Sequence, residues 1–372
     1  MSARKILFIV TRADTIGGVH RYIILFLRQL RDQGNQVSVI CGFSQGSPFT
    51  QALEDDSIPF LAVDSLNNNS SLLGDFSAIK SILSYINCID PDLVWSHSSK
   101  AGILSRLACA ISKKPSLFTV HGWSFSVQSK FSFIYLSIEF LFSYLPSHLI
   151  VISKYDYSIA RRLRFKLSRT KLIYNSTPRP LISESTVPFV KDDSRFTLLI
   201  VARLSPQKDH LTVLKALNIL QNPNIYLNIL GDGDLYDTLS SYIDKYNLSD
   251  QVSLLGHRDP TPYYQSADAF ILSSNWEGFP LTSLEALSHS LPLIVSDVCG
   301  CSEVVVPGFN GFIFEKNNSL QLSRAIATLL SLDSDHYLKM CKYSRRVYEF
   351  AFDYSRFCSQ TINYIDSLIP NV

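Results

Sequence analysis

Short runs of apolar and β-branched residues alternate along the chain with stretches in which apolar residues recur every three or four positions. Residues 5–10 (KILFIV) predict a first strand, and residues 19–34 predict a helix that ends at Gly34. Further strands are predicted at residues 36–41, 59–63, 92–96, 116–120 and 148–153. This alternation is typical of a parallel sheet that is covered by helices on both faces.

The alternation stops at a segment rich in Pro and Ser that has no period and is typical of a linker. It then resumes, with strands predicted at residues 197–202, 225–231, 252–256, 269–274 and 292–297, followed by two C-terminal helices. Because 372 residues are too many for one ordinary core, we predict two doubly wound α/β domains that face each other across a cleft. The predicted bounds are 1–175 for the first domain, 176–195 for the linker, 196–350 for the second domain, and 351–372 for a C-terminal helix that packs back on the first domain.

Composition and charge narrow the class of protein. The chain is 46% hydrophobic and 18% charged, which is typical of a globular protein, and its net charge of +2 does not indicate a nucleic-acid partner. The seven Cys residues have neither disulfide nor zinc spacing, which favours a reducing compartment. The first apolar run reads as a strand rather than a signal peptide, and no run reaches the roughly 18 apolar residues of a spanning helix.

A basic loop follows the first strand of the second domain. Residues 203–210 (RLSPQKDH) carry Arg203 and Lys208, and Lys208 lies at the start of the next predicted helix, where a cation opposes the helix dipole. One interpretation is that Asp209 caps this helix and the two cations are solvated. The other is that Arg203 and Lys208 clamp an anion, such as a diphosphate, in the cleft.

The next strand ends in the loop GDGDL at residues 231–235. Asp232 and Asp234 have the D-x-D spacing of some metal sites. We favour a tight turn made by Gly231 and Gly233, with Asp234 as the cap of the following helix.

Two glutamates, Glu277 and Glu285, flank the start of a predicted helix in NWEGFPLTSLEA, residues 275–286. Pro280 suits the first helical position, so that amides near Leu281 and Thr282 would face a phosphate. Glu285 would accept hydrogen bonds from a ribose diol, and Glu277 would reach hydroxyls beyond the phosphates. The alternative is that both are exposed carboxylates favoured by the helix dipole.

Three segments together resemble one family. They are residues 203–210, the S-x2-EGFPL-x3-EA pattern at residues 274–286, and residues 299–314 (CGCSEVVVPGFNGFIF). These segments resemble the retaining nucleotide-sugar glycosyltransferases of family 4, which have the GT-B fold of two Rossmann-like domains. Residues 95–108 and 118–126 look like the bacterial members that build surface polysaccharides, and the resemblance extends over essentially the whole chain.

The resemblance implies roles for the charged residues. Glu277 would contact the donor sugar, Glu285 would bind the ribose, and Arg203 and Lys208 would hold the diphosphate and stabilise the leaving group. Fixed cations suit that task because negative charge develops on the departing nucleotide diphosphate, and they remove the need for a metal or other cofactor. The donor-binding residues predicted in this way are Gly17, Gly18, Gly278, Phe279, Pro280, Leu281, Thr282 and Glu285.

The first domain adds further candidates at its strand ends. His121 matches the family's cleft histidine, which contacts the donor sugar near the reacting carbon, although a lone His is more often structural. His97 and Lys100 are candidates for the acceptor side. Gly17 and Gly18 match the family's glycine loop, a role that is compatible with an ordinary tight turn. His20 departs from the family pattern, in which small or acidic residues are common after the glycines.

The segment from Lys130 to Leu145 is rich in Phe, Tyr and Leu, and residues 161–171 (RRLRFKLSRTK) carry six cations and no acid. Such a pair of segments suits an anionic membrane surface, and a buried core helix beside a solvated basic face is the alternative. The resemblance favours peripheral contact with the cytoplasmic face of the inner membrane.

Taken together, we predict a retaining, metal-independent hexosyltransferase that needs no cofactor besides its co-substrate. It would move a hexose or N-acetylhexosamine from a UDP- or GDP-sugar to a lipid-linked glycan during bacterial surface-polysaccharide synthesis, without nucleic acid as a partner. The alternatives are a catalytically silent sugar-nucleotide-binding scaffold and a transferase that acts on a soluble sugar acceptor.

Overall fold

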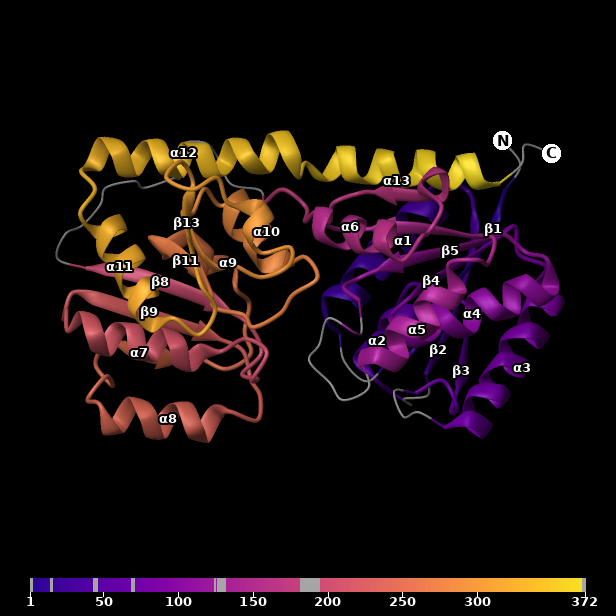
Figure 1. Cartoon of the computed structure of the whole chain (residues 1–372), viewed down its shortest axis with the longest axis horizontal. Coiled ribbons are helices and arrows are strands. Elements are labelled where there is room, and N and C mark those ends of the chain that lie inside the picture. The colour runs from indigo at the N-terminus through magenta and orange to yellow at the C-terminus, as the bar shows by residue number, and fades with distance from the viewer. Residues whose placement is uncertain are drawn as a thin grey trace. The chain divides into compact units, whose positions relative to one another are not determined.

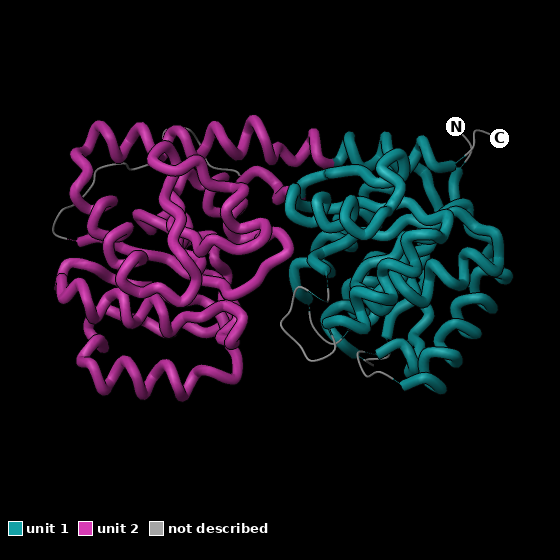
Figure 2. Tube along the Cα trace, viewed as in Figure 1, with its two compact units in different colours: residues 1–174, 358–372 teal, residues 175–357 magenta. Residues whose placement is uncertain are grey.

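The computed structural model describes residues 3–13, 16–42, 46–67, 71–123, 125, 132–180 and 195–369. The chain divides into two compact units (Figure 2). Unit 1 comprises Met1–Tyr174 and Cys358–Val372, and unit 2 comprises Asn175–Phe357. Residues 181–194 of the predicted linker lie outside the described residues, and residues 176–180 belong to unit 2.

Unit 1 is built on a seven-stranded sheet in the order β3-β2-β1-β4-β5-β6-β7, in which every paired strand is parallel (Figure 1). Its strands are β1 (Lys5–Val10), β2 (Gln36–Gly42), β3 (Phe60–Val63), β4 (Leu93–His97), β5 (Ser116–Val120), β6 (Ser147–Val151) and β7 (Thr170–Leu172). Its helices are α1 (Gly18–Asp32), α2 (Pro48–Asp55), α3 (Leu72–Ile89), α4 (Ser99–Ser112), α5 (Ser132–Phe142), α6 (Lys154–Arg162) and the 3-10 turn η2 (Leu167–Arg169).

Side-chain alternation along the central strands gives unit 1 two apolar layers. Leu7 and Val94 pack with residues of α3 and α4 on one face of the sheet. Phe8 and Trp95, one position further along each strand, contact each other on the opposite face, with ring centroids 4.9 Å apart, and Phe26 of α1 packs on Trp95. This period of two decides which side chains at the strand ends share a face.

Unit 2 repeats the architecture with a six-stranded sheet in the order β10-β9-β8-β11-β12-β13, again with parallel pairs. Its strands are β8 (Phe196–Val201), β9 (Ile225–Leu230), β10 (Val252–Leu254), β11 (Ala269–Leu272), β12 (Leu293–Ser296) and β13 (Gly311–Phe314). Its helices are α7 (His210–Leu220), α8 (Tyr236–Lys245), α9 (Thr261–Ser266), α10 (Leu281–Ser288), η4 (Ser302–Val304), α11 (Ser319–Leu330) and α12 (Ser334–Ala351).

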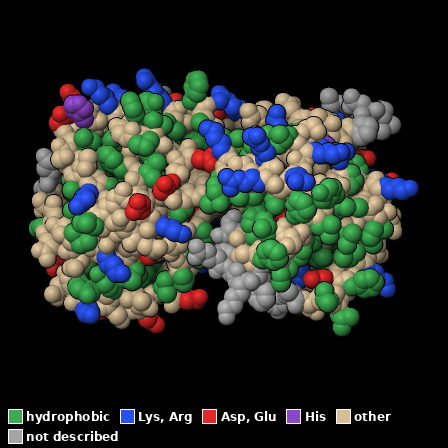
Figure 3. All heavy atoms as spheres, viewed as in Figure 1, with side chains coloured by type: hydrophobic (Ala, Val, Ile, Leu, Met, Phe, Trp, Pro, Cys, Tyr) green, Lys and Arg blue, Asp and Glu red, His purple; other side chains and the backbone are tan. Residues whose placement is uncertain are grey.

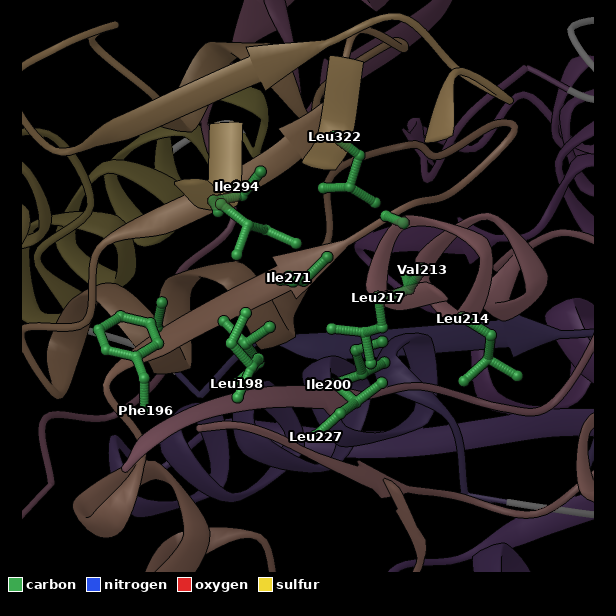
Figure 4. Packing of buried hydrophobic residues seen from close by; sticks show 14 of the residues in the cluster. Phe196, Leu198, Ile200, Val213, Leu214, Leu217, Leu227, Ile271, Ile294 and Leu322 are labelled. Carbon is green, nitrogen blue, oxygen red and sulfur yellow. The ribbon is translucent and has the colours of Figure 1, made fainter. Parts of the chain in front are cut away.

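Figure 4 shows the core between this sheet and its helices. Leu198 and Ile200 of β8 and Ile271 of β11 point toward Leu217 of α7 and Leu322 of α11, and all five are buried. The core fixes the strand ends, and the loops that follow β8 and β11 therefore start from rigid positions.

The last helix, α13 (Tyr354–Leu368), follows α12 after a break of two residues. Its later residues belong to unit 1, where Asp366 pairs with Arg4 and the Tyr364 hydroxyl donates to the Arg169 carbonyl at 3.0 Å.

The α/β class and the predicted strands are confirmed, and two strands were missed. β7 begins at the end of the basic segment 161–171, and β13 lies at the end of the segment 299–314. The predicted cap by Asp234 is wrong, because α8 begins at Tyr236 and its N-cap is Leu235, with no side-chain cap bond. Pro280 is the N-cap of α10 rather than its first helical residue.

Candidate active site

Two loops at the carboxyl edge of the unit 2 sheet are joined to each other by hydrogen bonds. The Asn275 amide N–H donates to the Gln207 carbonyl at 2.7 Å, and the Gln207 side chain donates to the Trp276 carbonyl at 2.9 Å. The Asn275 side-chain amide donates to the Pro206 carbonyl at 2.9 Å. The loop after β8 and the loop after β11 therefore form one rigid surface.

This surface brings Lys208 and Glu277 together. The Lys208 ammonium forms an ion pair with Oε1 of Glu277, and the Ser274 hydroxyl donates to the same oxygen at 2.7 Å. The Glu277 side chain is 9% exposed and that of Lys208 is 18% exposed, so solvent screens the pair only partly. Ser274 was missed by the sequence analysis, which assigned no role to its hydroxyl.

The main chain beside Lys208 is held in an uncommon conformation. Asp209 is the N-cap of α7 and has a φ of 45°, in the left-handed region. The Ser273 hydroxyl lies 2.9 Å from both the Lys208 and the Asp209 carbonyl oxygens, and Thr212 donates to the Asp209 carboxylate at 2.6 Å. Burial raises the pKa of Asp209. Asp209 therefore occupies the predicted cap position while the neighbouring ammonium of Lys208 reaches Glu277.

Arg203 lies at the other end of the same loop. Its side chain is exposed, and no acceptor for its guanidinium is found in the described part of the chain. The turn after β9 packs under this loop, because a Cβ on Gly233 would lie 2.3 Å from the Leu204 carbonyl oxygen. Arg203 is thus held on a constrained backbone with its charge open to solvent.

Glu285 lies one turn into α10 and is half-buried. The hydroxyl of Tyr264, a buried residue of α9, lies 2.9 Å from Glu285 Oε2. Tyr264 was also missed by the sequence analysis. The hydrogen bond from Tyr264 gives the Glu285 carboxylate a defined orientation beside the start of α10.

The entry to α10 is packed from behind by the loop that contains Gly300. Gly300 has a φ of +72°, and a Cβ on it would lie 1.9 Å from the Gly278 carbonyl oxygen. Phe279 and Pro280 are buried, and the Phe279 ring packs on Phe352 with centroids 5.5 Å apart. Two other predicted donor-binding residues, Leu281 and Thr282, open the helix and are half-buried.

In unit 1, His97 and His121 form a pair at the ends of adjacent strands. His97 Nδ1 lies 3.1 Å from His121 Nε2. His97 is fully buried and His121 is half-buried. Burial, together with neighbouring His121 and His20, lowers the pKa of His97 well below its usual range, and burial and His20 lower the pKa of His121 to about 3. Both imidazoles are neutral at neutral pH.

The glycine pair opens α1, where Gly17 is the N-cap and Gly18 the first helical residue. Among the described residues, the atom that a Cβ on Gly17 would meet is Nδ1 of His20, at 3.9 Å. The Gly17 amide donates to that nitrogen at 3.2 Å, and Nε2 of His20 lies 2.8 Å from the Arg12 carbonyl oxygen. His20 therefore holds the start of α1.

Lys100 opens α4 as predicted, but its ammonium pairs with Asp75 of α3 at 2.7 Å. Since His97 is buried, both candidates for the acceptor side are tied into unit 1, and their contact with an acceptor remains a prediction.

Helix α5 lies in the predicted aromatic segment, whose first residue, Lys130, is outside the described residues. Its single buried residue is charged: Glu139, 1% exposed, accepts from Arg106, 0% exposed, at 2.8 Å. The large apolar residues of this segment that are exposed are Phe133, Ile134, Leu136, Phe140, Leu141 and Tyr144. The interpretation of α5 as a buried core helix is therefore wrong.

No group of three or more His, Cys, Asp or Glu side chains within the described ranges is arranged to hold a metal ion. No described helix combines the length and apolarity required to cross a bilayer.

Comparison with known families finds matches over both halves of the chain. The model of glycosyl transferases group 1 matches residues 183–347, and the model of glycosyltransferase family 4 matches residues 16–178.

Among named proteins, a UDP-Gal:alpha-D-GlcNAc-diphosphoundecaprenol alpha-1,3-galactosyltransferase of Escherichia coli is 32% identical over 321 residues, which are 82% of each chain. Among solved structures, Anabaena HepE in complex with UDP has a TM-score of 0.83 at 22% identity and covers 98% of this chain and 100% of its own. The lipopolysaccharide outer core galactosyltransferase WaaB has a TM-score of 0.74 at 19% identity, with 98% and 99% covered. These two structures share the two-domain GT-B fold.

Proposed function

Because the chain belongs to glycosyltransferase family 4, we propose that it transfers a hexose or N-acetylhexosamine from a UDP- or GDP-sugar to a lipid-linked glycan. Transfer retains the anomeric configuration and needs no metal. The acceptor is an intermediate of bacterial surface-polysaccharide synthesis, and the reaction takes place at the cytoplasmic face of the inner membrane.

The observation that carries this proposal is the constellation of Lys208, Ser274 and Glu277. Cleavage of the bond between the sugar and the diphosphate leaves negative charge on the departing nucleotide. Lys208, held by its ion pair with Glu277, and Arg203, whose charge is open to solvent, both lie in the loop at the carboxyl edge of the sheet, where cations would stabilise such charge. With Oε1 of Glu277 held by Ser274 and Lys208, its other oxygen is available to a sugar hydroxyl.

The named relative supports particular donor and acceptor chemistry. The Escherichia coli enzyme takes its galactose from a UDP-sugar and acts on a sugar linked through a diphosphate to undecaprenol, as its name states. UDP-galactose is therefore the first donor to test, and a lipid-diphosphate-linked N-acetylhexosamine is the first acceptor. Glu285, oriented by Tyr264, would bind the ribose of either nucleotide.

The orientation of α5 supports contact with a membrane. Burying Glu139 toward Arg106 turns the apolar side chains of α5 outward, with Phe133 76% and Leu141 65% exposed. Exposed apolar residues gathered on one helix mark an interaction surface. On the face shown in Figure 3, hydrophobic side chains cluster over unit 1 and Lys and Arg side chains lie beside them.

The neighbouring charges favour an anionic bilayer as the partner. Arg164 lies over the ring of Phe140 at 6.0 Å, so the basic segment 161–171 adjoins α5. All of its cations except Arg169 are exposed. Each cation near an anionic lipid surface contributes about 1 kcal/mol to binding. Apolar insertion and charge attraction would then act on one side of unit 1.

Co-sedimentation with vesicles tests the membrane part of the proposal. We expect binding to vesicles that contain anionic lipid, weakened by salt and lost in the variant Phe133→Ser/Leu141→Ser. The control variant Phe309→Ser/Leu320→Ser changes exposed apolar residues of unit 2 and should bind like wild type. Equal binding by both variants would refute the assignment of α5.

Transfer of sugar from UDP-galactose to the lipid-linked acceptor tests the reaction itself. We expect product in the presence of EDTA, with an α-linkage by NMR, since the donor is α-linked. A β-linkage would rule out retention, and loss of activity that Mg²⁺ or Mn²⁺ restores would rule out metal independence.

A further inference from the structure

We propose that His97 is a positioning residue that fixes the tautomer of His121, so that His121 offers an Nδ1–H hydrogen-bond donor. The tautomer itself is a property of unit 1, and its use in catalysis rests on the proposed function.

The two rings meet because of strand alternation. His97 is the last residue of β4, and Thr119 is paired with it across the parallel register of β4 and β5. His121 lies two positions beyond Thr119, so it projects from the same face of the sheet. The ring centroids are 5.4 Å apart with an interplanar angle of 30°, and His97 Nδ1 approaches His121 Nε2 to 3.1 Å.

The surroundings of the pair keep both rings neutral. The Phe8 ring is stacked parallel to His97 at 5.7 Å, and the Tyr22 ring meets His121 edge-on at 5.2 Å. Among the described residues, the ionisable groups beside the pair are His20, which would add like charge, and Tyr22, whose pKa is raised by burial. Burial therefore disfavours an imidazolium at either position.

When both imidazoles are neutral, the hydrogen bond between His97 Nδ1 and His121 Nε2 contains one proton, so one ring donates and the other accepts. If His121 donated from Nε2, His97 would carry its own proton on Nε2. That nitrogen is buried and has no hydrogen-bond partner among the described residues. A buried N–H group without an acceptor is rare and costly, and an unpaired acceptor is tolerated more often. His97 therefore donates from Nδ1, and His121 accepts at Nε2.

The assignment defines what His121 can do. With Nε2 accepting, the proton of His121 lies on Nδ1, and this nitrogen donates to an oxygen atom of a ligand. In the opposite tautomer, Nδ1 of His121 would be unprotonated and would accept a hydrogen bond from a hydroxyl group of the ligand. With a pKa lowered to about 3, the ring holds its proton as a hydrogen-bond donor and does not transfer a proton at neutral pH. The buried His97 thus determines that His121 donates, rather than accepts, the hydrogen bond in its contact with the donor sugar.

Long-range ¹H–¹⁵N NMR of the full chain labelled with ¹⁵N-histidine tests the tautomer. The His121 signals are assigned by their loss in His121→Gln. We expect a protonated Nδ1 and an unprotonated Nε2 in wild type at neutral pH. The variant His97→Phe keeps the ring volume and its stacking on Phe8 but removes the donor, so His121 should shift to the Nε2–H form that free imidazole side chains prefer.

Activity is then compared between variants. His97→Phe should lower kcat/KM about tenfold, the effect of one lost hydrogen bond of about 1.4 kcal/mol. The same substitution at the half-buried His148 is the control. His148 lies opposite Leu117 near the amino end of β6, whereas His121 follows the carboxyl end of β5, so the change should leave both the His121 spectrum and activity unchanged.

The outcomes separate this inference from the proposed function. A wild-type His121 protonated at Nε2 would overturn the inference without any variant, as would an Nδ1–H form that persists in His97→Phe. The predicted tautomer with full activity in His121→Gln would support the positioning by His97 and refute the catalytic use of His121.

Discussion

The buried ion pair beneath α5 makes a sharp prediction about stability. Arg106→Met removes a guanidinium that is 0% exposed and leaves the Glu139 carboxylate, 1% exposed, without its cation. The arginine also donates from Nε to the Gly102 carbonyl at 2.8 Å, and its guanidinium carbon lies 4.9 Å from the Phe118 ring centroid. Removing one partner of such a pair costs about 3–5 kcal/mol, because the remaining charge is buried and uncompensated.

Removing both charges should cost far less. In Arg106→Met/Glu139→Leu, apolar side chains of similar volume replace the pair, a change that is often neutral or stabilising. The double variant should therefore lie within about 1 kcal/mol of wild type, and the double-mutant cycle should give a coupling energy of about 3 kcal/mol or more.

Urea unfolding followed by tryptophan fluorescence measures these changes. In a Trp276→Phe background the remaining tryptophans are Trp95 and Trp123, both buried in unit 1, so the signal reports on this unit. With a slope of about 2 kcal/mol per molar urea, the single variant should lower the midpoint by roughly 1.5–2.5 M. If the double variant loses as much stability as the sum of the two single variants, the pair does not hold α5 in its orientation.

Three further predictions follow from the sites. Lys208→Ala should lower kcat at least a hundredfold in a transfer assay, because it removes a contact that stabilises the transition state. The control Lys245→Ala, on the exposed surface of α8, should have no effect, and equal losses in the two variants would refute the role of Lys208 in holding the diphosphate. Gly300→Ala should destabilise unit 2 in chemical unfolding more than Gly308→Ala, because both have a positive φ but only Gly300 faces a carbonyl oxygen 1.9 Å from its Cβ, and equal costs would mean that close approach is unimportant. The free energy of unfolding should fall as the pH drops from about 6.5, the pKa of His in the unfolded chain, toward about 3, the pKa of His121 in the folded protein. The unfolded state binds more protons than the folded state in this window, so the slope is up to about 1.4 kcal/mol per pH unit for each such group. His121→Phe should reduce this slope.

The fold could be predicted from the sequence because its strands are buried on both faces. Residues 6–10 and 198–202, for example, are apolar throughout, and a loop follows each of these runs. Strand β7, Thr170–Leu172, has no apolar run that would predict it. It forms because these residues pair with β6. Strand β13 begins at Gly311, whose φ of +156° and lack of a side chain allow it to lie against the Leu293 carbonyl. Only the tertiary structure reveals this constraint.

The candidate site could be predicted only in its charged residues. Glu277 and Lys208 follow predicted strands, which placed them at one edge of the sheet. Their mutual ion pair, with Ser274 on the same oxygen, depends on how the two loops meet and has no signature in spacing. Tyr264 was missed for the same reason, because it approaches Glu285 from another helix.

The orientation of α5 shows a different limit. Its composition indicated either a core helix or a membrane-facing helix, and hydrophobicity alone could not decide between them. The partner of Glu139 is 33 positions earlier in the chain, so the contact that turns the apolar residues outward is invisible to periodicity.

Nucleotide release from a panel of donors tests the central claim most directly. UDP-galactose, UDP-glucose, UDP-N-acetylglucosamine and GDP-mannose would each be incubated with wild type, with Glu277→Ala and with the exposed control Glu315→Ala, with and without a bacterial lipid extract. We expect release from one UDP-sugar, stimulated by lipid, retained in Glu315→Ala and reduced at least a hundredfold in Glu277→Ala. Tight binding of a donor with no release from any of them would contradict the account and leave a sugar-nucleotide-binding protein without transferase activity.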